Sequence, residues 1–253
     1  THMPDTIDST QIPESLKNAK GIIPLKDLYK QHSKQYLAVD CIIFGFDKKK
    51  LKLLCIRRDF EPGKGQWSLM GGFVKDSEGI DDAAARVLYA LTGLHNRYLE
   101  QIQAYGDLGR DPAGRVVSIA YYALIDSVRF DEKISRDFHA QWFSLNKLPD
   151  LIFDHREMVQ KGLRRLRRRC KTEPVGFELL PPKFTMPQLM KLYEAIFQKE
   201  FDKRNFRKKI LSNGILRKLE EKDMEGSRKG AFFYEFEKKK YDELIRNGFS
   251  FSI

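Results

Sequence analysis

The sequence predicts two folded parts, a mixed α/β sandwich over residues 36–153 and a smaller domain of helices and a β-hairpin over residues 175–253. Strand-like apolar runs on both sides of a helical stretch predict the sandwich. Helical apolar spacing, followed by an alternating aromatic run, predicts the smaller domain. Residues 154–174 are expected to form a basic linker helix, and residues 1–35 a polar extension that contains a short docking helix.

The strands of the sandwich are predicted from runs rich in Val, Ile, Leu and Tyr. These runs cover residues 36–46, 51–58, 104–109 and 116–125. Between the second and the third run we expect a helix from Asp81 to Thr92, because Asp81 and Asp82 place carboxylates at the positive end of its dipole.

The C-terminal domain begins with Thr185 and Gln188, which have the spacing of a capping box. An amphipathic helix is expected to follow, with apolar residues at helical spacing: Leu189, Leu192, Tyr193, Ile196 and Phe197. Asp202 is a good N-cap for a second helix, KRNFRKKILS, whose outer face is basic. The segments ILRKLEE and AFFYEFE predict a hairpin around a Gly-containing loop. Helix, turn, basic helix and hairpin together predict a winged helix-turn-helix domain.

The excess positive charge lies in the C-terminal two fifths of the chain. Residues 1–154 contain 21 Lys and Arg against 21 Asp and Glu, whereas residues 155–253 contain 25 against 14, which gives the net charge of +11. This pattern is expected of a nucleic-acid-binding region attached to a domain with another kind of partner. No apolar run reaches the roughly 18 residues of a membrane span, so we expect a cytoplasmic protein without a membrane partner.

Residues 72–94 carry a spaced motif. The pattern is G-x5-E-x7-R-E-U-x-E-E-x-G-U, in which U is a bulky apolar residue. The positions of this sequence that match it are Gly72, Glu78, Arg86, Leu88, Gly93 and Leu94. The pattern resembles the Nudix box, and the preceding QWSLMGG is similar to the G-x-W-x-L-P-G-G that leads into such boxes, with Met70 in place of proline. The resemblance covers residues 36–150 and implies a Nudix-type sandwich.

In Nudix hydrolases three glutamates of the motif helix hold divalent cations, and in this sequence Val87, Ala90 and Leu91 occupy those positions. Residues at i, i+3 and i+4 share one helix face, where carboxylates would converge on a cation and apolar side chains supply no oxygen ligand. Without the cation, neither Lewis-acid activation nor the lowering of the pKa of water is available. We therefore expect no enzyme activity, no metal and no cofactor.

A degenerate Nudix-like domain followed by a winged helix resembles the Nudix-related, NrtR-like transcriptional regulators. The resemblance implies a homodimer that binds double-stranded operator DNA, expected to be a repressor, and that is released by a small molecule bound in a non-catalytic Nudix pocket. Some members respond to ADP-ribose, and a branch without the catalytic glutamates responds to pentose sugars. The residues at positions 87, 90 and 91 favour the arabinose-responsive AraR type, with L-arabinose as the effector and a role in carbohydrate metabolism.

Other interpretations of the same sequence are open. One is an ADP-ribose-responsive regulator. Another is a Nudix hydrolase of a nucleoside diphosphate derivative, with displaced metal ligands drawn from Glu78, Asp107 or Asp111. A further one is a constitutive DNA or RNA binder whose Nudix part only dimerises.

The candidate DNA-binding residues are basic or amide side chains of the second helix and its surroundings. They are Lys203, Arg204, Asn205, Arg207 and Lys208 in the helix, Arg228 and Lys229 at the hairpin tip, and Lys183 before the first helix. A recognition helix enters the major groove with its N-terminal residues first, where Arg can pair with guanine and Asn with adenine. The other residues are expected to contact phosphates, or the minor groove at the hairpin tip.

The candidate effector-binding residues are polar side chains near the motif: Asp40, Arg57, Lys75, Glu78 and Arg86. Sugar hydroxyls are held by paired donors and acceptors in a concave site. For Asp40 and Arg57 a structural ion pair is the alternative, since a buried charge needs a partner. For Glu78 and Arg86 the alternative is that they tie the motif loop together.

Overall fold

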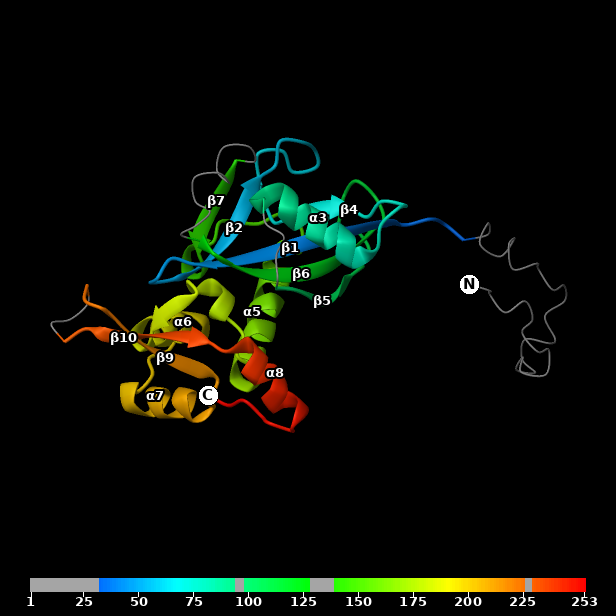
Figure 1. Cartoon of the computed structure of the whole chain (residues 1–253). Coiled ribbons are helices and arrows are strands. Elements are labelled where there is room, and N and C mark those ends of the chain that lie inside the picture. Colours follow the sequence, from blue (N-terminus) through cyan, green and yellow to red (C-terminus); the bar gives the residue numbers. More distant parts are fainter. Residues whose placement is uncertain (1–31, 94–97, 128–138, 226–228) are drawn as a thin grey trace, which may run out of the picture. The chain divides into compact units, whose positions relative to one another are not determined.

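The larger part of the fold is a seven-stranded mixed sheet (Figure 1). A computed structural model of the chain describes residues 32–93, 98–127, 139–225 and 229–253. The strands are β1 (Tyr36–Phe46), β2 (Leu51–Arg57), β3 (Trp67–Ser68), β4 (Met70–Phe73), β5 (Leu99–Tyr105), β6 (Val116–Asp126) and β7 (Ala140–Ser144). They run in the order β3-β2-β1-β6-β5, with β4 also paired to β1 and β7 to β2. The long strands β1 and β6 are parallel neighbours at the centre, and the other pairings are antiparallel.

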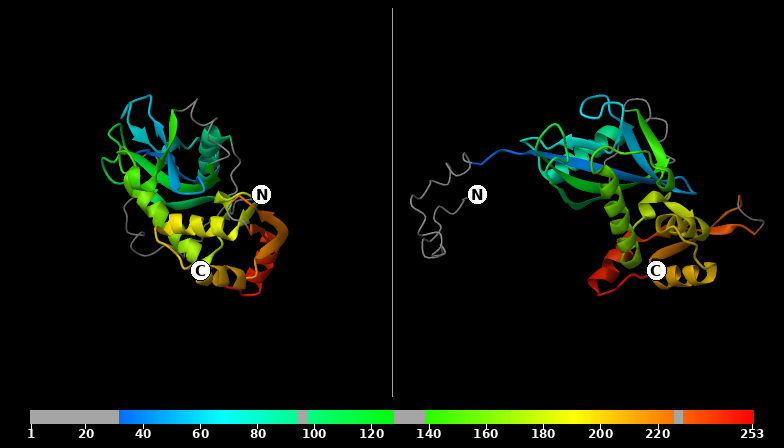
Figure 2. Two further views of the ribbon diagram at one scale, coloured as in Figure 1. Left: turned by 90° about the vertical axis from the view of Figure 1, so that its left-hand side faces the viewer. Right: turned by 180° about the vertical axis from the view of Figure 1, so that it is seen from behind.

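The two faces of this sheet are covered by different helices (Figures 1 and 2). Helix α3 (Ile80–Thr92) packs on one face, where its buried Ala84 and Val87 share an apolar cluster with Val39 of β1. Helix α5 (His155–Thr172) packs on the other face, in one cluster with Ile42 of β1. A Cβ atom at Gly162 of α5 would meet the Ile42 side chain at 3.1 Å, so the helix lies directly against the sheet.

The smaller part is a winged helix with a three-stranded sheet in the order β8-β10-β9. Its elements are η5 (Phe177–Leu179), β8 (Lys183–Thr185), α6 (Met186–Phe197), α7 (Lys203–Ser212), β9 (Leu216–Asp223), β10 (Ala231–Phe236) and α8 (Lys238–Arg246). Helix α6 begins with the predicted capping box, in which Thr185 accepts from the Gln188 amide and Gln188 accepts from the Thr185 amide. Asp202 caps α7 by accepting from the Asn205 amide at 2.8 Å.

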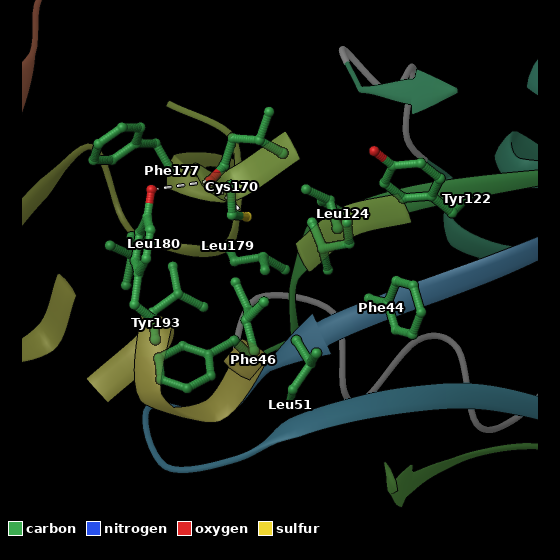
Figure 3. Packing of buried hydrophobic residues seen from close by; sticks show 14 of the residues in the cluster. Phe44, Phe46, Leu51, Tyr122, Leu124, Cys170, Phe177, Leu179, Leu180 and Tyr193 are labelled. Carbon is green, nitrogen blue, oxygen red and sulfur yellow. Dashed lines mark hydrogen bonds between the residues drawn. The ribbon is translucent and has the colours of Figure 1, made fainter. Parts of the chain in front are cut away.

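One apolar cluster connects the two parts (Figure 3). Phe46 and Leu51, at the hairpin of β1 and β2, face Leu179, Leu180 and Tyr193 of the winged helix, and all are buried. At its edge the packing leaves a cavity of about 220 Å³, lined by residues of both parts that include Lys48, Asp126 and Gln188. The junction is therefore held by hydrophobic contact but is not filled throughout.

The element predictions succeeded where periodicity and caps were strong. The structure confirms the strands at 36–46, 51–58 and 116–125 to within a residue, and the helices that became α3, α5, α6 and α7. The strand predicted at 104–109 was wrong, because β5 covers Leu99–Tyr105 and the chain turns after Tyr105. Strands β3, β4, β7 and β8 and helix α8 were not predicted.

The burial of a few further side chains completes the description of the fold. The cysteines Cys41, Cys55 and Cys170 are buried and free of disulfides. Phe73 is 59% exposed and packs against Tyr36, which is 65% exposed. The predicted docking helix and Arg228 lie outside the described residues. Among the helices that the structure describes, none is long and apolar enough to cross a membrane.

Candidate effector site and nucleic-acid interface

The loop between β4 and α3 is tied together by Glu78 and Arg86. The Arg86 guanidinium donates to both carboxylate oxygens of Glu78, at 2.8 and 2.5 Å, and to the Phe73 carbonyl at 2.9 Å. The Glu78 carboxylate also accepts from the Lys75 amide at 3.0 Å. The hydrogen bonds from Arg86 and Lys75 lower the pKa of Glu78 to about 2. Both groups are engaged with each other, as in the structural alternative for this pair.

The motif helix presents no cation site at the positions where Nudix hydrolases carry glutamates. Val87 is 3% exposed and faces Gly72, where a Cβ atom would lie 2.9 Å from the valine methyl. Ala90 is exposed on the helix and carries no ligand atom. Asp107 is exposed, and Asp111 accepts from the Ala113 amide. Within the described ranges no group of three or more His, Cys, Asp or Glu side chains could hold a metal ion, so these residues do not fit the Mg²⁺ of the Nudix hydrolases.

Asp40 lies on the other side of β4 in a buried polar network. Its carboxylate accepts from the Ser118 hydroxyl at 2.6 Å and lies 3.8 Å from the Arg110 guanidinium and 3.7 Å from His155 Nε2. Arg110 forms two hydrogen bonds with Asp154, at 2.8 and 2.7 Å. Burial lowers the pKa of Arg110, but the hydrogen bonds and charge of Asp154 outweigh it and the pKa is raised.

The alternative of an ion pair between Asp40 and Arg57 was wrong. The Arg57 Nε atom donates instead to the Gly65 carbonyl at 2.9 Å, because Arg57 is the exposed last residue of β2 and bonds the loop beyond that strand. Of the five candidate effector residues, the structure therefore brings Lys75, Glu78 and Arg86 together. Sequence patterns gave no signal for Arg110 and His155 as partners of Asp40, or for Asp154 as the partner of Arg110.

Helix α7 presents an exposed polar face. Its candidate DNA contacts are all exposed: Lys203, Arg204, Asn205, Arg207 and Lys208. Its apolar residues Phe206 and Ile210 are buried at 3% and 1% exposure. Arg207 donates to the Tyr234 hydroxyl at 3.3 Å. In the part of the chain that is described, no carboxylate lies within 4.0 Å of a cationic nitrogen of this helix.

Other cations of the winged helix are partly neutralised. Lys183 pairs with Glu221 at 2.8 Å, so its ammonium is shared with a carboxylate, and Lys238 pairs with Asp242 at 2.9 Å. Lys229 is exposed next to the hairpin tip. Sequence reasoning did not single out Lys218 and Lys222, whose ammonium groups lie 3.6 and 4.5 Å from the Phe232 ring centroid. Their spacing of four residues in a strand, on one face, was the available signal.

The arginine-rich stretch of α5 is divided between two roles. Arg165 and Arg169 pair with Glu100 of β5. Arg167 donates to the Ile196 carbonyl at 2.6 Å and to Gln198 at 2.7 Å, which fixes α5 to the end of α6. Arg164 and Arg168 are exposed. Part of the basic character of this helix therefore serves its internal attachment.

A Nudix-type α/β domain, joined through a basic helix to a winged helix with a cationic second helix, defines a class of DNA-binding regulators. Residues 34–162 match the model of the NUDIX domain, and residues 176–236 match that of the NrtR DNA-binding winged helix domain. The chain belongs to the NrtR-like family of Nudix plus winged-helix regulators.

Relatives of both functional kinds are similar to this chain. The ADPR responsive transcriptional repressor NtrR of Acinetobacter baylyi is 32% identical over 210 residues, covering 81% of this chain and 84% of the relative. The ADP-ribose pyrophosphatase of Methanocaldococcus jannaschii is 35% identical over 147 residues, which cover 58% of this chain and 85% of the relative. The crystal structure of Shewanella oneidensis NrtR complexed with a 27mer DNA has a TM-score of 0.73 and 27% identity, and the match covers 79% of this chain and 93% of that chain.

These comparisons bear on the predicted effector. They support the NrtR-like family and the Nudix plus winged-helix fold, and the printed name of the Acinetobacter relative concerns ADPR. None of them supports the arabinose-responsive type or a role in carbohydrate metabolism. The interpretation as an ADP-ribose-responsive regulator, given above as an alternative, therefore fits the comparisons better than L-arabinose.

Proposed function

We propose that this chain is a transcriptional repressor that binds operator DNA through its winged helix and is released by a small molecule bound to its Nudix domain. The observation that carries the proposal is the exposed basic face of α7, which lies on the same chain as a motif helix with apolar residues at the metal positions. The printed name of the Acinetobacter relative, which is that of a transcriptional repressor, supports the proposal.

The DNA contact is proposed for α7 and the wing. Arg204 and Asn205 would reach base edges, because both are exposed in the first turn of the helix, and the exposed Lys208 one turn further on would contact a phosphate. Lys203, Arg207 and Lys229 would contact phosphates. Because Lys183 is already paired with Glu221, we assign it a smaller share of the binding energy. We propose that two copies bind a two-fold-symmetric operator, as helix-turn-helix proteins commonly do.

ADP-ribose is the first candidate for the effector, on the strength of the Acinetobacter relative's name. Lys75 and Arg86 at the motif loop would supply the cations that contact a diphosphate bound there. L-arabinose is the second candidate, and a specific observation favours it: Val87 and Ala90 remove the cation ligands from which a pyrophosphate site would gain. In either case we propose that the effector is bound and not hydrolysed, since metal-assisted hydrolysis requires the missing carboxylates.

Calorimetric titration of the purified, metal-free protein would test the effector. ADP-ribose, L-arabinose and D-xylose would be titrated separately, and each mixture would then be incubated with Mg²⁺ and analysed by NMR for cleavage. Saturable binding of ADP-ribose or L-arabinose without cleavage supports the proposal and selects the effector. Mg²⁺-dependent cleavage of ADP-ribose would contradict it and return the chain to the hydrolases, and no binding of any of the three would remove these effectors.

A further inference from the structure

A set of buried and partly buried polar groups joins the first turn of α5 to the centre of the sheet. Arg110, whose side chain is 5% exposed, bonds Asp154 through two parallel hydrogen bonds and lies 3.8 Å from Asp40. His155 Nδ1 accepts from the Leu69 amide at 3.1 Å, and its other ring nitrogen faces Asp40. Buried charges of this kind depend on each other, because displacing one leaves its partner desolvated and unpaired.

On the sheet side, this network touches β4, the strand that leads into the motif loop. Asp40 is the register partner of Gly71, and a Cβ atom at Gly71 would lie 2.3 Å from the Asp40 carboxylate. Two residues further on, the Phe73 carbonyl accepts from Arg86. Strand β4 is thus held by Asp40 at one point and by the Arg86–Glu78 pair at another. A ligand that rearranges Arg86 acts on the strand against which Asp40 is packed.

On the helix side, the network holds the start of a helix whose other end holds the winged helix. Asp154 precedes the first residue of α5, and Arg167 in its fourth turn bonds the last residues of α6. Helix α5 is continuous over 18 residues. A hydrogen-bonded helix moves as a unit, so a shift of its first turn is carried to α6 and from there to α7.

We propose that Asp40, Arg110 and Asp154 form the connection through which a change at the motif loop reaches α5 and the DNA-binding domain. The inference rests on the proposed function, because it describes how effector binding alters operator binding. The ion pairs have two distinct arrangements, closed and broken, and the ligand favours one of them. The residues act as positioning residues and need not touch effector or DNA.

The test uses Asp154→Asn in the full-length protein, with Asp150→Asn as the matched control. Both substitutions remove one carboxylate charge near the start of α5. Asp150 pairs with Arg156 at 3.2 Å on the surface, and its own side chain is fully exposed. Hydrogen exchange is measured first, without any ligand. We expect D154N to accelerate exchange about threefold or more both in the first two turns of α5 and in β4, and D150N to change neither.

Unchanged exchange in β4 of D154N would overturn the proposal, because the helix and the strand would then respond independently. Arg110→Lys supplies a second variant that keeps the charge and loses the two parallel hydrogen bonds, should D154N fold poorly. It is expected to accelerate exchange in the same two segments.

Operator release is measured second, by fluorescence anisotropy with ADP-ribose and, separately, with L-arabinose as the probe. Both variants should bind the operator and the active probe within about threefold of the wild type, while the probe weakens operator binding in the wild type and D150N but no longer in D154N. Full release of D154N by the probe would also overturn the proposal. If neither probe releases the wild type, the proposed effectors fail, and the exchange measurement alone still decides this inference.

Discussion

Glu78, a candidate effector-binding residue in the sequence, is hydrogen-bonded within the motif loop. Its carboxylate is bonded by Arg86 and the Lys75 amide, which holds its pKa near 2 instead of 4.5. Because the folded pKa lies below the unfolded one, its contribution to stability is full above about pH 4.5 and is lost as the pH falls toward 2. Urea unfolding of Glu78→Gln should therefore show a stability deficit at pH 7 that shrinks as the pH is lowered from 4.5.

The control for this prediction is Glu220→Gln, which removes an exposed carboxylate that makes no ion pair with another described residue. The free energy of unfolding of this variant should be close to that of the wild type at every pH. A deficit of Glu78→Gln that is the same at pH 3 and pH 7 would contradict the assignment of the low pKa.

His155 predicts a second pH dependence, in a different range. Burial lowers its pKa below 6.5, against the charges of Asp40 and Asp154. The unfolded chain therefore binds the proton more readily, and the stability present above pH 6.5 is lost as the pH falls through the lower folded value. His155→Asn keeps an acceptor for the Leu69 amide. In thermal unfolding, its melting temperature should fall less between pH 7 and pH 5 than that of the wild type. His139→Asn, at an exposed histidine, should leave the loss unchanged.

The predictability of the site differed from residue to residue. The replacement of the catalytic glutamates by Val87 and Ala90 was readable, because the motif has fixed spacings and both residues lie on α3. The partners of Asp40 were not readable. Arg110 and His155 are separated from it by long stretches of chain, and only the sheet and the start of α5 bring them together.

At the scale of elements, the capping box of α6 gives a direct test. Thr185 is 2% exposed, and its side chain accepts from the Gln188 amide at the helix start. Thr185→Ala should destabilise the protein by about 1 kcal/mol, because an orphan amide of the first turn loses its acceptor. Thr185→Ser keeps the oxygen and should retain most of that stability in urea unfolding. A serine variant as unstable as the alanine variant would show that the methyl group, and not the cap, matters.

Helix α7 gives the second test at this scale. If it enters the major groove, Arg204→Gln should weaken operator binding by about 1–3 kcal/mol and relax the base preference at one position. Lys208→Gln should weaken binding to all sequences and lower the slope of log affinity against log salt by about one. Lys238→Gln is the control, since Lys238 lies on α8 and is paired with Asp242. Equal losses in all these variants would argue for a nonspecific charge effect.

Elements with local signals were predicted and those that depend on distant partners were not. Helices α6 and α7 carry apolar periodicity and a side-chain N-cap in the residue directly before them, and α3 carries apolar periodicity with Asp81 and Asp82 in its first turn. The short strand β8 is stabilised by pairing with β10, and the highly charged α8 by packing Tyr241 and Leu244 on the winged-helix core. Strand β5 lies at the edge of the sheet, where polar residues such as those in LEQIQ are tolerated. Because those polar residues hide a strand pattern, the strand was predicted too far along the chain, from Ala104 onward.

At the scale of the whole molecule, the division of charge follows the division into two parts. The excess of Lys and Arg over Asp and Glu belongs to residues 155–253. Of the arginines in α5, however, Arg165 and Arg169 pair with Glu100 of β5, and Arg167 bonds the end of α6. The net charge therefore overstates the cations available to DNA. Within the described residues, the exposed cations of α7 have no carboxylate within 4.0 Å, whereas Lys183 and Arg217 beside the wing are paired with Glu221 and Glu235.

The most direct test of the central claim follows operator release and the fate of the effector in one sample. The operator complex would be titrated with ADP-ribose and, separately, with L-arabinose in the presence of EDTA, with anisotropy reporting DNA binding and NMR reporting the ligand. We predict that one of them weakens operator binding tenfold or more, which corresponds to about 1.4 kcal/mol of coupling, and remains intact. Operator binding that is unchanged at saturation with both, or release that occurs only when Mg²⁺ is added and the ligand is cleaved, would contradict the claim.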